Sequence, residues 1–140
     1  EFMPLGTRQA WQQDHVVSGS EIIEQIRSHI PLIPLPAGNP SETSTRWSLG
    51  QGAGEIGVIA PVTQPFCGNC NRIRLTADGK IRTCLFSLGE HDLKPALRSG
   101  ASDIELADQL QRIILKKEPG HRIGAPDFVQ PERTMSRIGG

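Results

Sequence analysis

The hydrophobic and polar positions along the chain predict two amphipathic helices. Isoleucines recur at helical spacing over residues 20–30, behind a capping-box pattern at 18–21, and Pro31 ends the run. A second apolar stripe covers residues 103–117 and again follows a capping-box pattern, at 102–105. We therefore expect one helix in each region.

Short apolar segments bounded by turn residues predict two antiparallel hairpins. Residues 45–49 and 55–60 flank a glycine-rich turn, and residues 72–77 and 80–86 flank Asp78-Gly79. An Asp-Gly dipeptide favours a two-residue type I′ turn. The second hairpin is therefore the better defined of the two in sequence.

The remaining segments lack a sustained period. Residues 1–6 are expected to be the end of a strand that enters a loop. The proline-rich residues 31–44 predict an extended connector, either a linker or an active-site loop, and residues 120–140 predict an irregular C-terminal arm. The pattern as a whole predicts an α+β fold with antiparallel hairpins and two or three helices.

Composition and charge exclude several classes of function. The chain has 140 residues, and its 15 Lys plus Arg balance its 15 Asp plus Glu, so the net charge does not indicate a nucleic-acid partner. No apolar run approaches the roughly 18 residues of a membrane helix and no secretory signal is evident, so we expect a cytoplasmic protein. The 3 cysteines are odd in number and grouped together, which favours metal binding over disulfides.

The cysteines have a spacing typical of a metal site. Cys67-Gly68-Asn69-Cys70 is a C-x-x-C knuckle, in which two thiolates can reach one metal centre. A two-residue turn at Asp78-Gly79 would place Leu75 opposite Arg82 and Ile73 opposite Cys84. Cys84 would then return beside Cys70, so that all three thiols share one site.

The spacing leaves the identity of the metal open. Structural zinc needs four protein ligands, and His91 is the nearest candidate to complete a set with Cys67, Cys70 and Cys84. Such a protein would be a zinc-stapled binding module. An iron-sulfur cubane held by three thiolates would instead leave one iron open to a substrate, and an electron-transfer domain is a third alternative.

Two arginines next to the knuckle suggest an anionic ligand. Arg72 and Arg74 are two residues apart in a predicted strand, so their side chains project from the same face. Guanidinium groups suit phosphate or carboxylate, although a solvated strand face would give the same pattern. The expected register puts Cys84 on the Ile73 face, so the metal centre must lie at the open end of the hairpin or a bulge must intervene.

The run from Phe66 to Lys80, completed by Cys84-Leu85-Phe86, resembles the C-terminal motif of the MoaA family, the radical-SAM GTP cyclases of molybdenum cofactor biosynthesis. Residues 1–6 resemble the last barrel strand of that family, and residues 136–140 its terminal double-glycine tail. The resemblance implies the C-terminal part of an incomplete radical-SAM α/β barrel. It divides the chain into residues 1–43, with the end of the barrel, helix and connector, and residues 44–140, with the cluster and GTP-binding region.

The resemblance also implies specific roles for individual residues. It implies an auxiliary 4Fe–4S cluster on Cys67, Cys70 and Cys84, GTP contacts from Arg72, Ile73 and Arg74, and a catalytic role for Gly139 and Gly140. The implied reaction converts GTP to 3′,8-cyclo-7,8-dihydro-GTP. S-adenosylmethionine and a second 4Fe–4S cluster would belong to an N-terminal radical-SAM portion whose cysteine motif is absent here. We therefore expect the chain alone to be inactive and to require that portion as a partner, and we consider a homodimer as a further assembly.

Overall fold

The protein is described from a computed structural model, which describes residues 1–6 and 11–138. It forms two compact units, the first with residues 1–3 and 11–70 and the second with residues 4–6 and 71–138. Each unit combines helix with a three-stranded antiparallel sheet, so the predicted α+β class is confirmed. In chain order the described elements are η1 (Gln13–His15), α1 (Gly19–Arg27), β1 (Ile33–Leu35), β2 (Thr45–Ser48), β3 (Glu55–Val58), η2 (Cys67–Asn69), β4 (Arg74–Leu75), β5 (Lys80–Arg82), β6 (His91–Asp92), α2 (Lys94–Arg98), α3 (Asp103–Ile114) and η3 (Met135–Arg137).

Helix α1 of the first unit begins at a side-chain cap. The Ser18 hydroxyl accepts a hydrogen bond from the Glu21 backbone amide at 3.1 Å, as the sequence pattern predicts. The helix ends at Arg27, earlier than expected. Its first residue, Gly19, lies so close to Ala60 that a Cβ atom at position 19 would be 2.9 Å from the Ala60 Cβ. This close approach requires glycine.

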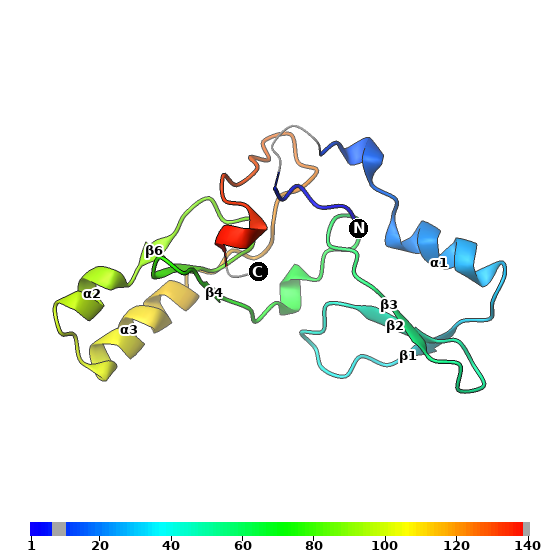
Figure 1. The fold of residues 1–140 in the computed structure, drawn as a ribbon, viewed down its shortest axis with the longest axis horizontal. Helices are drawn as coiled ribbons and strands as arrows, with labels where there is room; N and C mark the ends of the chain where they lie inside the picture. The colour runs from blue at the N-terminus through cyan, green and yellow to red at the C-terminus, as the bar shows by residue number, and fades with distance from the viewer. Residues whose placement is uncertain (7–10, 139–140) are drawn as a thin grey trace. The chain divides into compact units, whose positions relative to one another are not determined.

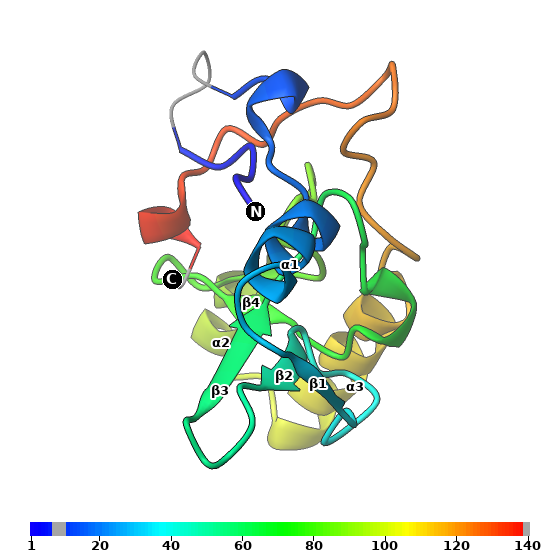
Figure 2. The same ribbon diagram turned by 90° about the vertical axis from the view of Figure 1, so that its right-hand side faces the viewer.

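The sheet of the first unit has the strand order β1-β2-β3 (Figures 1 and 2). The predicted hairpin is confirmed: β2 pairs with β3, with Trp47 opposite Ile56. Strand β1 lies within the segment 31–44 that the sequence predicted to be a connector, and it places Pro34 opposite Trp47. Proline cannot donate to a sheet ladder, but an edge strand tolerates it.

Residues 1–6 are not a strand, contrary to the expectation from sequence, because no described segment pairs with them. The Glu1 carboxylate instead accepts hydrogen bonds from the backbone amides of Gly19 at 2.8 Å, Val62 at 2.9 Å and Thr63 at 3.0 Å. Side-chain contacts therefore take the place of the expected strand pairing. The radical-SAM α/β barrel that the family resemblance implies remains a prediction.

The second unit contains the hairpin β4–β5, whose register differs from the predicted one by one residue. Arg74 lies opposite Arg82, because the turn has three residues and closes with a hydrogen bond from the Thr76 amide to the Lys80 carbonyl at 2.9 Å. Gly79 has φ +80°, whereas Asp78 is not among the residues with positive φ. A type I′ turn needs positive φ at both positions, so the two-residue turn does not form.

A small core holds helix α3 against this sheet. Ile81 of β5 and Ile113 of α3 form a buried cluster with Leu93, which directly precedes α2. Leu110 of α3 packs against this cluster. Figure 1 shows α3 beside the sheet, with α2 nearby. The sequence predicted α3 and its capping box, and both are confirmed, although the helix ends at Ile114. Strand β6 and helix α2 were not predicted.

The C-terminal arm is irregular, as expected. From residue 115 to residue 138 its only described helical element is η3. Nowhere in residues 1–6 and 11–138 is a helix long and apolar enough to cross a bilayer.

Candidate metal centre

The C-x-x-C knuckle belongs to the first unit and forms a tight turn. Cys67–Asn69 is a short 3-10 helix, closed by a hydrogen bond from the Cys70 amide to the Cys67 carbonyl at 3.0 Å. Cys67 and Cys70 are both half-buried. This local fold is compatible with two thiolates that bind one metal centre.

Cys84 belongs to the second unit and follows β5. It is half-buried, and its sulfur accepts a hydrogen bond from the Phe86 backbone amide at 3.4 Å. Amide-to-sulfur hydrogen bonds stabilise a thiolate and tune metal centres that thiolates hold. The environment of Cys84 therefore suits a metal ligand.

The ammonium group of Lys117 joins the two sides of the hairpin at its open end. It donates to the Arg72 carbonyl at 3.0 Å and also to the Thr83 carbonyl. The two backbone segments before β4 and after β5 are therefore close together. Extending the observed register by two residues along each strand would place Arg72 opposite Cys84, which removes the conflict that the predicted register created.

The Glu118 carboxylate fixes the segment on both sides of Cys84. It accepts hydrogen bonds from the Thr83 hydroxyl at 2.6 Å and from the Ser87 hydroxyl at 2.5 Å. Burial raises the pKa of Glu118, but the hydrogen bonds from Ser87 and Thr83 outweigh it and hold the pKa below its ordinary value of 4.5. Glu118 is therefore an ionised carboxylate at neutral pH.

A cavity of about 580 Å³ within the second unit borders Cys84. His91 and His121 also line it. Phe86 contacts His121 edge to face, with ring centroids 5.3 Å apart, and Phe128 at 6.3 Å. An aromatic wall beside a thiol gives this cavity a mixed apolar and polar lining.

The arginines next to the knuckle do not form a solvated strand face. Arg72 and Arg74 are half-buried, whereas the residues that alternate with them are exposed, Ile73 by 41% and Leu75 by 62%. A solvated face would show the opposite pattern. The side of this segment that carries the two guanidinium groups is therefore the covered one.

The three thiols come from two units, so the cluster on Cys67, Cys70 and Cys84 remains a prediction. Within either unit taken by itself, the described residues form no group of three or more His, Cys, Asp or Glu side chains that could hold a metal ion. His91, the alternative zinc ligand, lines the same cavity as Cys84. Gly139 and Gly140 lie outside the described residues.

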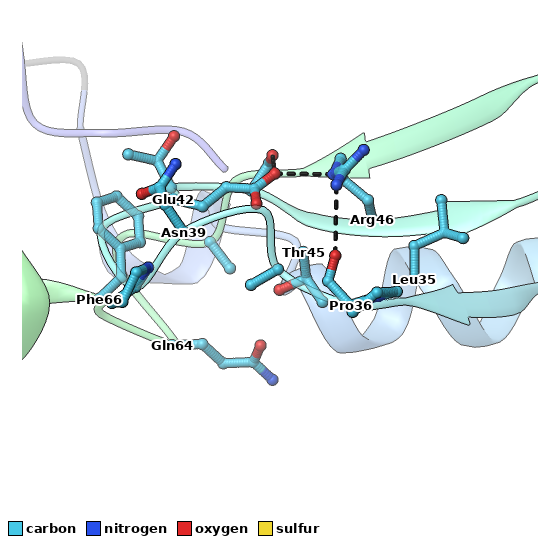
Figure 3. A pocket seen from close by; sticks show the side chains of 13 residues that line it. Leu35, Pro36, Asn39, Glu42, Thr45, Arg46, Gln64 and Phe66 are labelled. Atoms are coloured by element: carbon cyan, nitrogen blue, oxygen red, sulfur yellow. Dashed lines mark hydrogen bonds and ion pairs between the residues drawn. The ribbon is translucent and has the colours of Figure 1, made fainter.

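The first unit has a separate cavity of about 180 Å³ that contains none of the predicted site residues. Figure 3 shows the Arg46 side chain between Glu42 and Pro36. Arg46 forms an ion pair with Glu42 at 2.8 Å and donates to the Pro36 carbonyl at 3.3 Å. Its charge is already balanced, so this cavity offers a weaker site for an anion.

The sequence analysis missed Lys117 and Glu118. They lie three and four residues after the end of α3, where a basic residue is ordinarily explained by the helix dipole. Their contacts span between 31 and 45 residues of sequence, and no local pattern encodes such a separation. An adjacent Lys-Glu pair before Pro119-Gly120 was the only available signal.

Comparison with known proteins identifies the family. The model of the Molybdenum Cofactor Synthesis C family matches residues 1–123, and the chain belongs to this family. Over its full length the chain is similar to proteins named GTP 3′,8-cyclase, with 44% identity in Mycolicibacterium smegmatis, 43% in Corynebacterium glutamicum (strain ATCC 13032) and 42% in Rhodopirellula baltica. It covers 40%, 38% and 40% of those relatives and matches their C-terminal part.

Proposed function

We propose that this chain is the C-terminal, GTP-binding portion of a GTP 3′,8-cyclase, a radical-SAM lyase of molybdenum cofactor biosynthesis. The proposal draws on the family and on relatives of that name that are similar along the whole chain. The reaction belongs to a longer protein, because the chain spans about 40% of the length of these relatives. An N-terminal portion supplies S-adenosylmethionine binding and the first 4Fe–4S cluster.

In this proposal Cys67, Cys70 and Cys84 hold an auxiliary 4Fe–4S cluster. The observation that carries it is the Lys117 contact with both Arg72 and Thr83. Cys70 precedes Arg72 by two residues, a reach of about 7 Å, and Cys84 directly follows Thr83. Chain connectivity thus favours a shared centre. When bound, the cluster supplies an open iron to which the guanine of GTP can bind.

Arg72 and Arg74 bind the charged part of the nucleotide, and Ile73 contacts it. Arg72 and Arg74, both half-buried and two positions apart in the segment, support this role. Bidentate guanidinium groups match phosphate geometry. The function of this region is therefore to orient GTP rather than to generate the radical.

The direct test is iron and acid-labile sulfide analysis after anaerobic reconstitution. Wild-type chain should retain a cubane, and Cys67→Ser, Cys70→Ser and Cys84→Ser should each lose it, because two thiolates leave two irons exposed. The zinc alternative, which the presence of His91 and Cys84 in one cavity favours, predicts stoichiometric zinc without sulfide and zinc loss in His91→Ala. Full iron retention in any cysteine variant would contradict the assignment.

The chain alone should not cleave S-adenosylmethionine, because its 3 cysteines are committed to one centre. Release of 5′-deoxyadenosine by the purified chain would show that the chain itself generates the radical, which contradicts the proposal. The assay requires a two-cluster enzyme as the positive control.

Gly139 and Gly140 are proposed to enter the nucleotide site and to support radical formation. Two glycines can approach a ligand or another backbone more closely than other residues. Deleting both from a two-cluster enzyme that contains this sequence should leave both clusters and GTP affinity in place while cyclisation falls steeply. Survival of the activity would make the tail an ordinary terminus.

A further inference from the structure

Arg133 of the C-terminal arm forms a bidentate contact with the tip of the β4–β5 hairpin. Its two terminal nitrogens donate to the two carboxylate oxygens of Asp78, at 3.1 Å and 2.7 Å. The contact joins positions 55 residues apart in sequence. A two-pronged guanidinium–carboxylate pair fixes orientation as well as distance.

The same guanidinium group also contacts Glu90. The Arg133 Nε atom is 2.6 Å from one Glu90 oxygen, and Nη2 donates to the other at 2.9 Å. Glu90 in turn binds Arg82 at 2.8 Å and Lys80 at 3.2 Å. Exposed isolated pairs contribute little, but the side chains of Glu90 and Arg82 are only 14% and 3% exposed, and the charges form a network.

Arg133 is also connected to the end of the described arm. It donates to the Arg137 carbonyl at 3.3 Å, and the amides of Arg137 and Ile138 close the 3-10 turn η3. Ile138, which directly precedes Gly139, is 0% exposed. One side chain thus joins the hairpin tip, Glu90 and the last described turn.

We infer that Arg133 is a positioning residue that latches residues 131–138 onto the β4–β5 hairpin and so fixes the position of Ile138, the residue before Gly139. The catalytic consequence of the latch rests on the proposed function. The latch itself does not, because it is defined by contacts between described residues. Loss of the latch should free the arm while the hairpin core stays folded.

The test is hydrogen exchange in a two-cluster enzyme that contains this sequence. Arg133→Gln and Asp78→Asn should each accelerate amide exchange at residues 137–138 by about tenfold or more, since η3 then opens independently of the core. The double variant should not exceed Arg133→Gln alone, because that variant already removes the Asp78 contact together with the contacts to Glu90 and the Arg137 carbonyl. Arg98→Gln, which removes an exposed arginine from α2, is the matched control and should leave exchange unchanged.

Exchange at α3 amides 107–113 separates a latch from general destabilisation. Unchanged exchange at α3 with faster exchange at residues 137–138 supports the latch. Equal acceleration of both regions, or wild-type exchange at residues 137–138 in Arg133→Gln, would overturn it. Iron content and GTP binding of the wild-type enzyme are measured in parallel, so a failure of the proposed function is recognised separately from a failure of the latch.

Discussion

The two hairpins, one in each unit, differ in what stabilises them. In β2–β3 four residue pairs form the ladder. The turn at Gly52 is open, because a Cβ atom at this position would have no neighbouring atom within 4 Å. In β4–β5 only two pairs form, but side chains from distant segments hold both ends: Arg133 at the tip and Lys117 at the open end. The shorter ladder thus depends on tertiary contacts, and one of them, made by Lys117, involves Thr83, the residue directly before Cys84.

The largest expected effect comes from removing the contact at the open end. Lys117→Met keeps a long side chain but leaves the Arg72 and Thr83 carbonyls without its ammonium group. Two hydrogen bonds to a charged group are lost, so we expect destabilisation of about 3 kcal/mol and loss of most bound iron. Urea unfolding and iron analysis measure both, and Lys116→Met is the matched control. Full iron content in Lys117→Met would show that the open end does not need this contact.

The next largest effect is on GTP binding, which we expect to depend on arginines at the second hairpin and not on an arginine of the first. Arg72→Ala or Arg74→Ala should weaken GTP binding by about tenfold or more while the cluster stays bound, because each removes a charge-assisted contact. Arg46→Ala in β2 should leave affinity unchanged, since Arg46 is paired with Glu42. Calorimetric titration of the reconstituted protein provides the comparison. Wild-type GTP affinity in all three variants would show that Arg72 and Arg74 do not contact the nucleotide.

A pair of glycine substitutions compares the two turns directly. Gly52 and Gly79 have similar positive φ values, +74° and +80°, so Gly→Ala should cost about 1 kcal/mol at each. At Gly79 the new Cβ would also lie 2.6 Å from the Lys94 Cγ, which must move. Gly79→Ala should therefore destabilise more than Gly52→Ala in urea unfolding. Equal destabilisation by the two variants would show that the Lys94 side chain moves aside without cost.

The smallest effect is the pH dependence that Glu118 contributes through its contacts with Thr83 and Ser87. Because the native pKa of Glu118 is below 4.5, its stabilising contribution is complete above about pH 4.5 and is lost as pH falls through the native pKa. We expect at most about 1 kcal/mol after solvent screening. Unfolding of the cluster-free chain from pH 3 to 7 should show a shallower acid slope in Glu118→Gln than in wild type. Identical slopes would show that Glu118 does not contribute to the acid response.

Local patterns predicted the elements that local interactions stabilise. Helix α3 formed where its capping box and apolar stripe predicted it, and the β2–β3 hairpin formed around its glycine turn. Strands β1 and β6 were missed because strands of two or three residues carry too short a pattern and depend on a neighbouring strand. A turn at Asp78-Gly79 was predicted and is present, but the predicted two-residue type was wrong and the predicted register was wrong by one residue.

The sequence by itself determined the cysteine knuckle, the paired arginines and the family, because residue identity and close spacing are sufficient for each. Only the tertiary structure decided that Arg72 and Arg74 lie on the covered side of their segment and that the turn has three residues. It also decided that Lys117 and Arg133 hold the two ends of the hairpin. Hydrogen bonds between residues 45 or 55 positions apart depend on how the chain returns in space, and no sequence period records that.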